Sequence, residues 1–284
     1  MNVRKKIPVI IPFYKNKNQL DKCIEKLNSQ ENVVTEIFIR DNSDDNILYT
    51  KAVNEGLKKF VYSDDYDYVL VLTQDVYLDR HALDKLASAL EDNMAIGIAA
   101  PIQIGPQQQI TWAGSLSAFP WGVHNMAEPQ YTAPFKTFWA NGACMLLRVS
   151  MVREIGLFDE NMLFIFSDCD YSFTARLRSW DVMVVPEAKC EHYLKASISN
   201  DKPELNAVKM ADQLFFTAKW INGIAFQSLD YEGQLLGPST VQKVFSKNVR
   251  ALNQAKHYFL NFKKPTLTHS IFSILDRVLK ATHL

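Results

Sequence analysis

The first hundred residues alternate short apolar runs with amphipathic helical segments, and this alternation constrains the fold more than any other feature. The apolar runs at residues 7–11, 33–40, 68–72 and 96–100 have the length of buried strands. Between them, residues 18–29, 47–60 and 79–91 repeat apolar side chains at helical spacing. Strands separated by helices of about 10–15 residues indicate βαβ units. We therefore expect an α/β fold with a mostly parallel sheet flanked by helices.

Polar or aromatic clusters follow three of these strands directly. They are Pro12-Phe13-Tyr14, Asp41-Asn42-Ser43 and Thr73-Gln74-Asp75. Any one cluster has residue types that are typical of a turn. The carboxyl ends of parallel strands, however, meet at one edge of the sheet, where ligands bind in open α/β folds. The three clusters together predict a ligand site at that edge.

The remainder of the chain has a different character. Residues 101–148 contain five prolines and three tryptophans, which predicts loops and short strands over the sheet edge. We expect a strand at 138–148 to return to the core. From about residue 200 the pattern is helical, with segments near 203–220, 239–262 and 267–281.

Two aspartates follow an aromatic run in the second half of the chain. Asp168 and Asp170 come directly after residues 164–166, which are Phe, Ile and Phe. Apolar neighbours desolvate a carboxylate and raise its pKa toward that of a useful general base. In the alternative interpretation, Asp168 caps the helix that starts near Cys169.

Charge is balanced overall but uneven along the chain. The net charge is zero, so nothing global indicates nucleic-acid binding. Residues 241–284, however, hold eight Lys or Arg and one Asp, a net charge of +7. The last predicted helix also has an apolar stripe. We expect it either to contact an anionic membrane surface peripherally or to pack on the catalytic domain or on a second subunit as a homo-oligomer.

The cysteines and the N-terminus predict a cytoplasmic protein. The four cysteines form no CxxC pair and no metal-ligand spacing, as expected for reduced, mostly buried thiols. The apolar run after Arg4-Lys5-Lys6 is too short for a signal peptide, and no run is long enough to span a membrane. Any membrane contact would be peripheral, at the inner face.

Taken together, the motifs resemble those of inverting family 2 glycosyltransferases of the GT-A fold, over about residues 7–195. The matching segments are VIIPFY (residues 9–14), DNS (41–43), AVNEG (52–56), VLVLTQD (69–75), GACMLLR (142–148), GLFDE (156–160), SDCD (167–170) and EH (191–192). The order and spacing of these segments make the resemblance specific. It implies a GT-A catalytic domain at residues 1–200 and leaves 201–284 as a basic helical C-terminal region.

The resemblance implies a UDP- or dTDP-sugar donor bound at the strand ends. The implied donor-binding residues are Pro12, Tyr14, Asp41, Asn42, Ser43, Gln74 and Asp75. Asp75 matches the last residue of the family's Asp-x-Asp motif, and His192 matches a histidine that joins the metal or the phosphates. Oxygen ligands and a diphosphate favour Mg²⁺ or Mn²⁺ at Asp75 and His192.

Asp168 matches the catalytic base that takes a proton from an acceptor hydroxyl. We place Asp170, Trp139 and Asn141 on the acceptor side or in support of the base. Asp159 and Glu160 either fix the loop that carries the site or satisfy backbone amides. The implied acceptor is a glycan or a lipid-linked glycan, as in bacterial polysaccharide synthesis, and a rhamnosyltransferase is the specific hypothesis.

Three departures from the family pattern support an alternative. Thr73 stands where the family often has Asp or Asn, Ser167 replaces the usual Glu before the base, and Thr174 stands where Arg is common. A protein that binds nucleotide-sugars without turning them over would tolerate these changes. A dinucleotide-dependent oxidoreductase is disfavoured, because no GxGxxG follows the first strand.

Overall fold

The computed structural model describes residues 5–117, 122–192 and 203–220, together with the isolated residues 239, 243 and 246. The strands are β1 (Lys5–Phe13), β2 (Val33–Asp41), β3 (Tyr68–Leu72), β4 (Val76–Leu78), β5 (Ile96–Ile104), β6 (Ile110–Trp112), β7 (Ser115–Ser117), β8 (Val123–His124), β9 (Phe135–Lys136), β10 (Cys144–Arg148) and β11 (Asp181–His192). The helices are α1 (Lys17–Asn28), α2 (Leu48–Phe60), α3 (Ala82–Asp92), α4 (Val149–Ile155), α5 (Ser167–Leu177) and α6 (Pro203–Trp220).

The main sheet has the strand order β2-β1-β3-β10-β5-β11-β4. Strand β1 pairs in parallel with β2 and β3, and β11 pairs in parallel with β5. Strand β10 is antiparallel to both β3 and β5, so β5 points the same way as β3. Strand β4 is antiparallel to β11. All strands in this order except β10 and β4 therefore run in one direction. This mainly parallel sheet confirms the predicted fold class.

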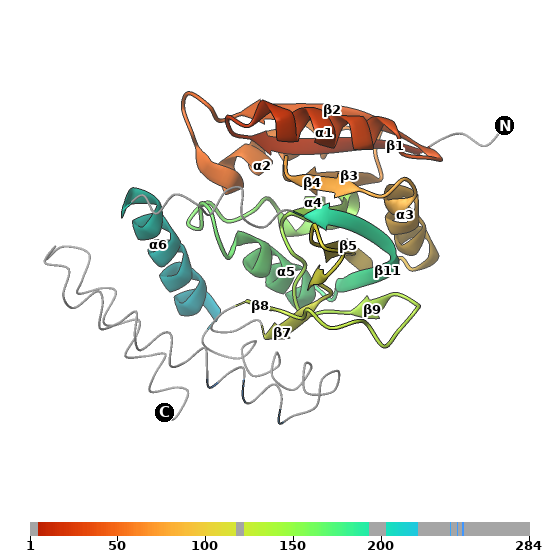
Figure 1. Ribbon diagram of the computed structural model, residues 1–284. Coiled ribbons are helices and arrows are strands. Elements are labelled where there is room, and N and C mark those ends of the chain that lie inside the picture. The colour runs from red at the N-terminus through yellow and green to blue at the C-terminus, as the bar shows by residue number, and fades with distance from the viewer. Residues whose placement is uncertain are drawn as a thin grey trace, which may run out of the picture.

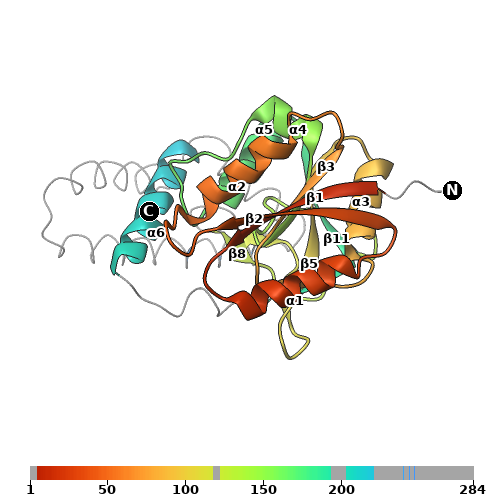
Figure 2. The ribbon, with the colours of Figure 1, turned by 90° about the horizontal axis from the view of Figure 1, so that it is seen from above.

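Helices cover both faces of the sheet. Side chains from α2, α4 and α5 share one buried cluster, to which α6 adds Phe216 and Trp220. Side chains from α1 and α3 belong to a second cluster on the other face. Figure 2 shows α2 and α5 on one side of β1 and β2, with α1 on the other. In Figure 1, α6 lies beside α5, at the end of the molecule away from the N-terminus.

The four strands and three helices predicted in the first hundred residues are all present, with small shifts of their ends. The strand expected at 138–148 was wrong in its first half, because β10 begins only at Cys144. Phe138 and Trp139 are buried, so their apolar character reflects packing of an irregular segment and not a strand. The predicted helix at 203–220 matches α6. The helices expected at 239–262 and 267–281 lie outside the described residues, apart from three isolated positions.

No helix in the part of the chain that the structure describes is long and apolar enough to cross a lipid bilayer.

Candidate active site

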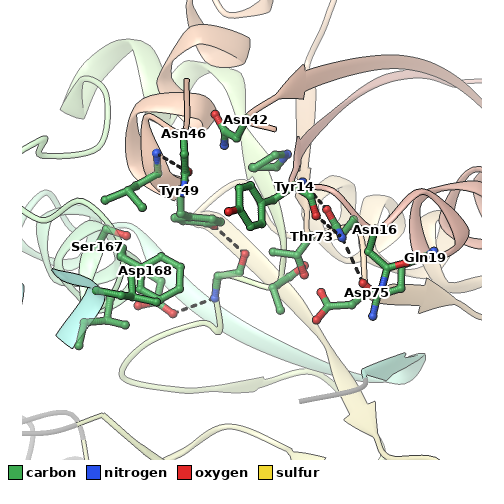
Figure 3. Close-up of a pocket in the computed structure, with 18 of the residues that line it drawn as sticks. Tyr14, Asn16, Gln19, Asn42, Asn46, Tyr49, Thr73, Asp75, Ser167 and Asp168 are labelled. Carbon is green, nitrogen blue, oxygen red and sulfur yellow. Dashed lines mark hydrogen bonds between the residues drawn. The ribbon is translucent and has the colours of Figure 1, made fainter. Parts of the chain in front are cut away.

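A cavity of about 400 Å³ opens at the sheet edge where β1, β2, β3 and β11 end (Figure 3). Because β10 runs the other way, its first residues reach the same edge. The cavity brings together seven predicted site residues, which are Pro12, Tyr14, Asn42, Gln74, Asp75, Asp168 and His192. The rule that ligands bind at the carboxyl ends of parallel strands therefore located the cavity correctly. Figure 3 shows Asp168 and Asp75 on opposite sides of it.

Asp168 lies in the first turn of α5, which begins at Ser167 and not at Cys169. One carboxylate oxygen accepts a hydrogen bond from the Cys169 amide at 2.9 Å. The other accepts from the Gly142 amide, also at 2.9 Å. Asp168 is therefore not the cap of α5, because the N-cap position is Phe166 and no side chain caps it; Asp168 lies inside the first turn and lines the cavity. Burial raises the pKa of its carboxyl, and the two amide bonds oppose that shift.

Gly142 is held on both sides of its backbone. Its amide donates to Asp168, and its carbonyl accepts a 2.6 Å hydrogen bond from the Tyr49 hydroxyl. A Cβ atom on Gly142 would lie 2.9 Å from the Tyr49 hydroxyl and 3.0 Å from the Asp168 Cβ. Only glycine therefore lets this backbone approach the carboxylate so closely.

On the other side of the cavity, Gln74 joins the ends of β1 and β3. Its side-chain oxygen accepts from the Tyr14 amide at 2.6 Å, and its Nε2 donates to the Tyr14 carbonyl at 3.2 Å. Asn42 lies beside them, with its amide bonded to the Phe13 carbonyl at 2.8 Å. The Asn42 side-chain oxygen is buried and has no partner among the described residues. Asn42 lines the cavity, so a ligand donor that reaches its side-chain amide could satisfy this unpartnered acceptor.

Asp41 and Ser43 build the turn next to the cavity and do not line it. The Ser43 amide donates to the Asp41 carboxylate at 2.8 Å, and the Ser43 hydroxyl accepts from the Lys15 amide at 3.1 Å. These hydrogen bonds from Ser43 hold the pKa of the Asp41 carboxyl below its usual value. Both residues hold the end of β2 in position beside Tyr14.

Asp75 and His192 form the candidate metal site. Their nearest side-chain atoms, Oδ2 and Nε2, lie 3.8 Å apart, and both residues are buried. The β4–β11 register pairs His192 with Val76, which brings His192 next to Asp75. The Nδ1 of His192 contacts the Gln103 side-chain oxygen at 2.8 Å, which leaves Nε2 as the acceptor nitrogen. Burial lowers the pKa of His192, which favours the neutral, metal-binding form.

The chemistry of this pair fits a divalent ion that takes further ligands from a diphosphate and water. Two ligand atoms about 2.1 Å from a common ion can lie 3.8 Å apart. Within residues 5–117, 122–192 and 203–220, no group of three or more His, Cys, Asp or Glu side chains could hold an ion alone. Among the described residues, Asp75 and His192 would therefore supply only part of the coordination shell.

Trp139 and Asn141 lie behind the cavity and do not line it. Asn141 contacts the His124 Nε2 at 3.3 Å and accepts from the Ala143 amide at 2.9 Å. The ring of His124 packs 5.6 Å from that of Trp139 and contacts the Thr111 carbonyl through Nδ1. These residues hold the turn that presents Gly142 to Asp168.

Asp170 faces α6 and not the cavity. Its carboxylate accepts from the Trp220 indole at 2.7 Å and forms an ion pair with Lys219 at 2.9 Å. Lys219 also pairs with Asp159 at 2.9 Å. Glu160 accepts a 3.0 Å hydrogen bond from Asn54 of α2. Asp159 and Glu160 thus tie the loop before α5 to two helices.

Several cavity residues were not predicted from the sequence. They are Asn16, Gln19, Asn46, Leu48, Tyr49, Gly142, Ala143 and Leu205, whereas Thr73 belongs to a predicted strand-end cluster and residues 164–167 directly precede Asp168. Asn16 had a usable signal, since it caps α1 by accepting from the Gln19 amide at 3.3 Å. Tyr49 had none, because its partner Gly142 is 93 residues away.

Comparison with known proteins gives a family and a fold. The family model described as "Glycosyltransferase like family 2" matches residues 49–208. The structure is similar to the crystal structure of S. aureus TarS, with a TM-score of 0.53 and 12% identity over 82% of this chain and 43% of that one. It is also similar to the crystal structure of GalNAc-T7 with UDP, GalNAc and Mn²⁺, with a TM-score of 0.55 and 11% identity over 85% of this chain and 54% of that one.

The chain therefore spans about half the length of these two structures. At such low identity they show the fold alone, which is of the GT-A type. No curated protein matches the sequence.

Proposed function

We propose that this chain, which belongs to glycosyltransferase-like family 2, transfers a sugar from a UDP- or dTDP-linked donor to an acceptor hydroxyl. The transfer inverts the anomeric centre of the sugar. One observation carries the proposal. The carboxylate of Asp168 lies in the wall of a cavity whose opposite wall consists of the strand ends with Tyr14, Asn42 and Asp75. A single cavity thus offers a proton acceptor and a nucleotide-sized set of polar groups.

In the proposed reaction, Asp168 takes the proton of the acceptor hydroxyl. The acceptor oxygen attacks the anomeric carbon from the face opposite the leaving group, and the bond from that carbon to the diphosphate oxygen breaks. One displacement inverts the anomeric centre without a covalent sugar–enzyme intermediate. The Gly142 and Cys169 amides hold the Asp168 carboxylate in place throughout.

The donor would lie along the strand ends. We assign the base and ribose to Pro12, Tyr14 and Asn42, where the unpartnered Asn42 oxygen supports the assignment. Asp75 and His192 would hold Mg²⁺ or Mn²⁺. A bound ion would neutralise the charge that develops on the diphosphate as it leaves. The presence of UDP and Mn²⁺ in the GalNAc-T7 structure supports this choice of ligands.

The acceptor, the sugar and the domain division are also part of the proposal. We propose a glycan or lipid-linked acceptor in bacterial polysaccharide synthesis, with rhamnosyl transfer as the specific form to test first. We also propose a catalytic domain at 1–200 and a helical region at 201–284. The buried cluster shared by α5 and α6 indicates that the beginning of the second region packs on the first.

The test is nucleotide release by the full-length protein from a panel of UDP- and dTDP-sugars with Mn²⁺ or Mg²⁺. We expect release from at least one donor, and we expect Asp168→Asn to abolish it. Asp21→Asn, at an exposed position of α1, is the matched control and should leave release unchanged.

The binding-only alternative is supported by Thr73, which supplies a hydroxyl and no carboxylate beside Asp75. Binding of UDP or dTDP, seen as a thermal shift, without release from any donor would favour that alternative over transfer.

A further inference from the structure

Helix α6 contributes an acidic side chain that contacts the wall of the cavity from behind. Asp212 is buried, with 1% of its surface exposed, and its carboxylate accepts three backbone hydrogen bonds. They come from the amides of Leu163 at 2.9 Å, Phe164 at 2.7 Å and Ile165 at 2.9 Å. Successive amides that converge in this way form an anion-binding concavity, and here the anion is part of the same chain.

The segment held by Asp212 leads directly to the proposed base. Phe164 and Ile165 line the cavity, and Asp168 follows within one helical turn. Phe166, between them, has a φ of 63°, an unusual value for a bulky side chain. Its ring stacks on Phe216 of α6, with ring centroids 5.0 Å apart. A backbone in this conformation persists only where its surroundings hold it.

The opposite side of the same segment is attached to α2. The Thr50 amide donates to the Leu163 carbonyl at 3.0 Å, and the Thr50 hydroxyl donates to the Met162 carbonyl at 2.5 Å. The segment is therefore held between α2 and α6. Only the α6 side carries a charge, so its hydrogen bonds are the stronger ones.

We infer that Asp212 is a positioning residue for the proposed reaction: it fixes the backbone of residues 163–165 and thereby the position of the Asp168 carboxylate. The inference rests on the proposed function, and it concerns a residue beyond the segment 49–208 that the family model matches. Asp212 does not touch the cavity, so it acts through the backbone that it holds. In Figure 1, α6 lies beside α5, where this arrangement places it.

The experiment uses Asp212→Asn in the full-length protein. Asparagine offers a single acceptor oxygen, so at least one of the three amides loses its partner. We expect kcat for nucleotide release to fall about tenfold or more, because small displacements of a catalytic group slow the chemical step. The donor KM should stay within about twofold, since the proposed donor-side groups lie at or just beyond the ends of β1, β2, β3 and β11 and not in residues 163–165. Hydrogen exchange at the amides of residues 163–165 should become faster.

Phe215→Ala is the matched control, since Phe215 is an exposed residue of the same helix. It should change neither kcat nor the exchange of residues 163–165. If Asp212→Asn is unfolded at the assay temperature, Asp212→Ser is used instead. The smaller serine side chain leaves room for water to hydrogen-bond to the amides of residues 163–165.

Wild-type kcat and wild-type exchange in the Asp212 variant would overturn the inference. A loss of kcat matched by an equal loss of donor binding and of folded protein would also overturn it, since that pattern indicates stability alone. If the wild-type protein releases no nucleotide from any donor, the proposed function fails. The exchange measurement then decides separately whether Asp212 holds residues 163–165.

Discussion

Replacing Gly142 by alanine tests the close approach of the Gly142 backbone to Asp168 in the candidate active site. The new Cβ would lie 2.9 Å from the Tyr49 hydroxyl, 3.0 Å from the Asp168 Cβ and 3.2 Å from the Asp168 Oδ2. Carbon atoms pack favourably at about 3.5–4.0 Å, so Asp168 or the turn at Gly142 must shift by about 0.5 Å. The shift would strain both hydrogen bonds of Gly142, one to Asp168 and one from Tyr49.

The size of this shift gives the expected effect. A displacement of about 1 Å can slow an enzyme about 100-fold, so about 0.5 Å should lower kcat about tenfold, which is about 1.4 kcal/mol of activation free energy. Overpacking should lower the free energy of unfolding by about 1–3 kcal/mol. For a domain of this size, each kcal/mol lowers Tm by about 2–4 °C.

The assay is nucleotide release from the preferred donor, with kcat and donor KM measured alongside thermal unfolding. Gly156→Ala is the matched control. Gly156 has a φ of 86°, and no atom lies within 4 Å of the position that a Cβ would take, so alanine should cost about 1–3 kcal/mol of stability through backbone strain alone. Its kcat per folded molecule should equal that of the wild type.

Removing the hydroxyl of Tyr49 provides a second check. Tyr49→Phe in the Gly142→Ala background removes the 2.9 Å contact together with the hydrogen bond to the Gly142 carbonyl, and it should not restore kcat, because the contacts with Asp168 remain. A wild-type kcat in Gly142→Ala would refute the claim that the Gly142 backbone positions the Asp168 carboxylate.

Two further predictions concern pH and metal. Asp168 must be ionised to accept a proton, so turnover is present above its pKa and lost as the pH falls through it. Since burial raises that pKa, the acid limb of kcat should lie above the ordinary aspartate value of about 4, and a flat profile down to that pH would contradict the assignment. For the metal, Asp75→Asn and His192→Gln should each raise the Mn²⁺ concentration for half-maximal release about tenfold or more. Release that persists unchanged in a chelator would exclude this role for the pair.

The sequence predicted the parts of the fold that repeat with a clear period. Strands β1, β2 and β3 are apolar runs in a sheet covered by helices on both faces, which is why their positions were correct. Strand β4 has three residues, too few for any periodicity to show. The segment at Phe138 and Trp139 is apolar because it is buried, and burial alone does not distinguish a strand from an irregular segment.

The residues of the candidate site also fall into a group that the sequence could predict and a group that it could not. Residues at the ends of predicted strands could be placed together, because the direction of the strands determines where their ends meet. Tyr49 and Asp212 could not be found, because both contact backbone groups of distant residues. Every residue has a backbone amide and carbonyl, whatever its side chain. Nothing in the sequence therefore marks Leu163 as the partner of Asp212 or Gly142 as the partner of Tyr49.

The pairing of β4 with β11 joins two stretches of chain that are far apart in the sequence. The donor-side groups, including Asp75, come from the first stretch, whereas Asp168 and His192 come from the second. Under the proposed function, a chimera that combines the first stretch with the second stretch of a relative would keep Tyr14, Asn42 and Asp75 and exchange Asp168 and its surroundings. It would succeed only if His192 still pairs with Val76, because a slip of one residue would turn the imidazole to the other face of the sheet. The register of a three-residue strand thus limits how freely the two halves of such an enzyme can be recombined.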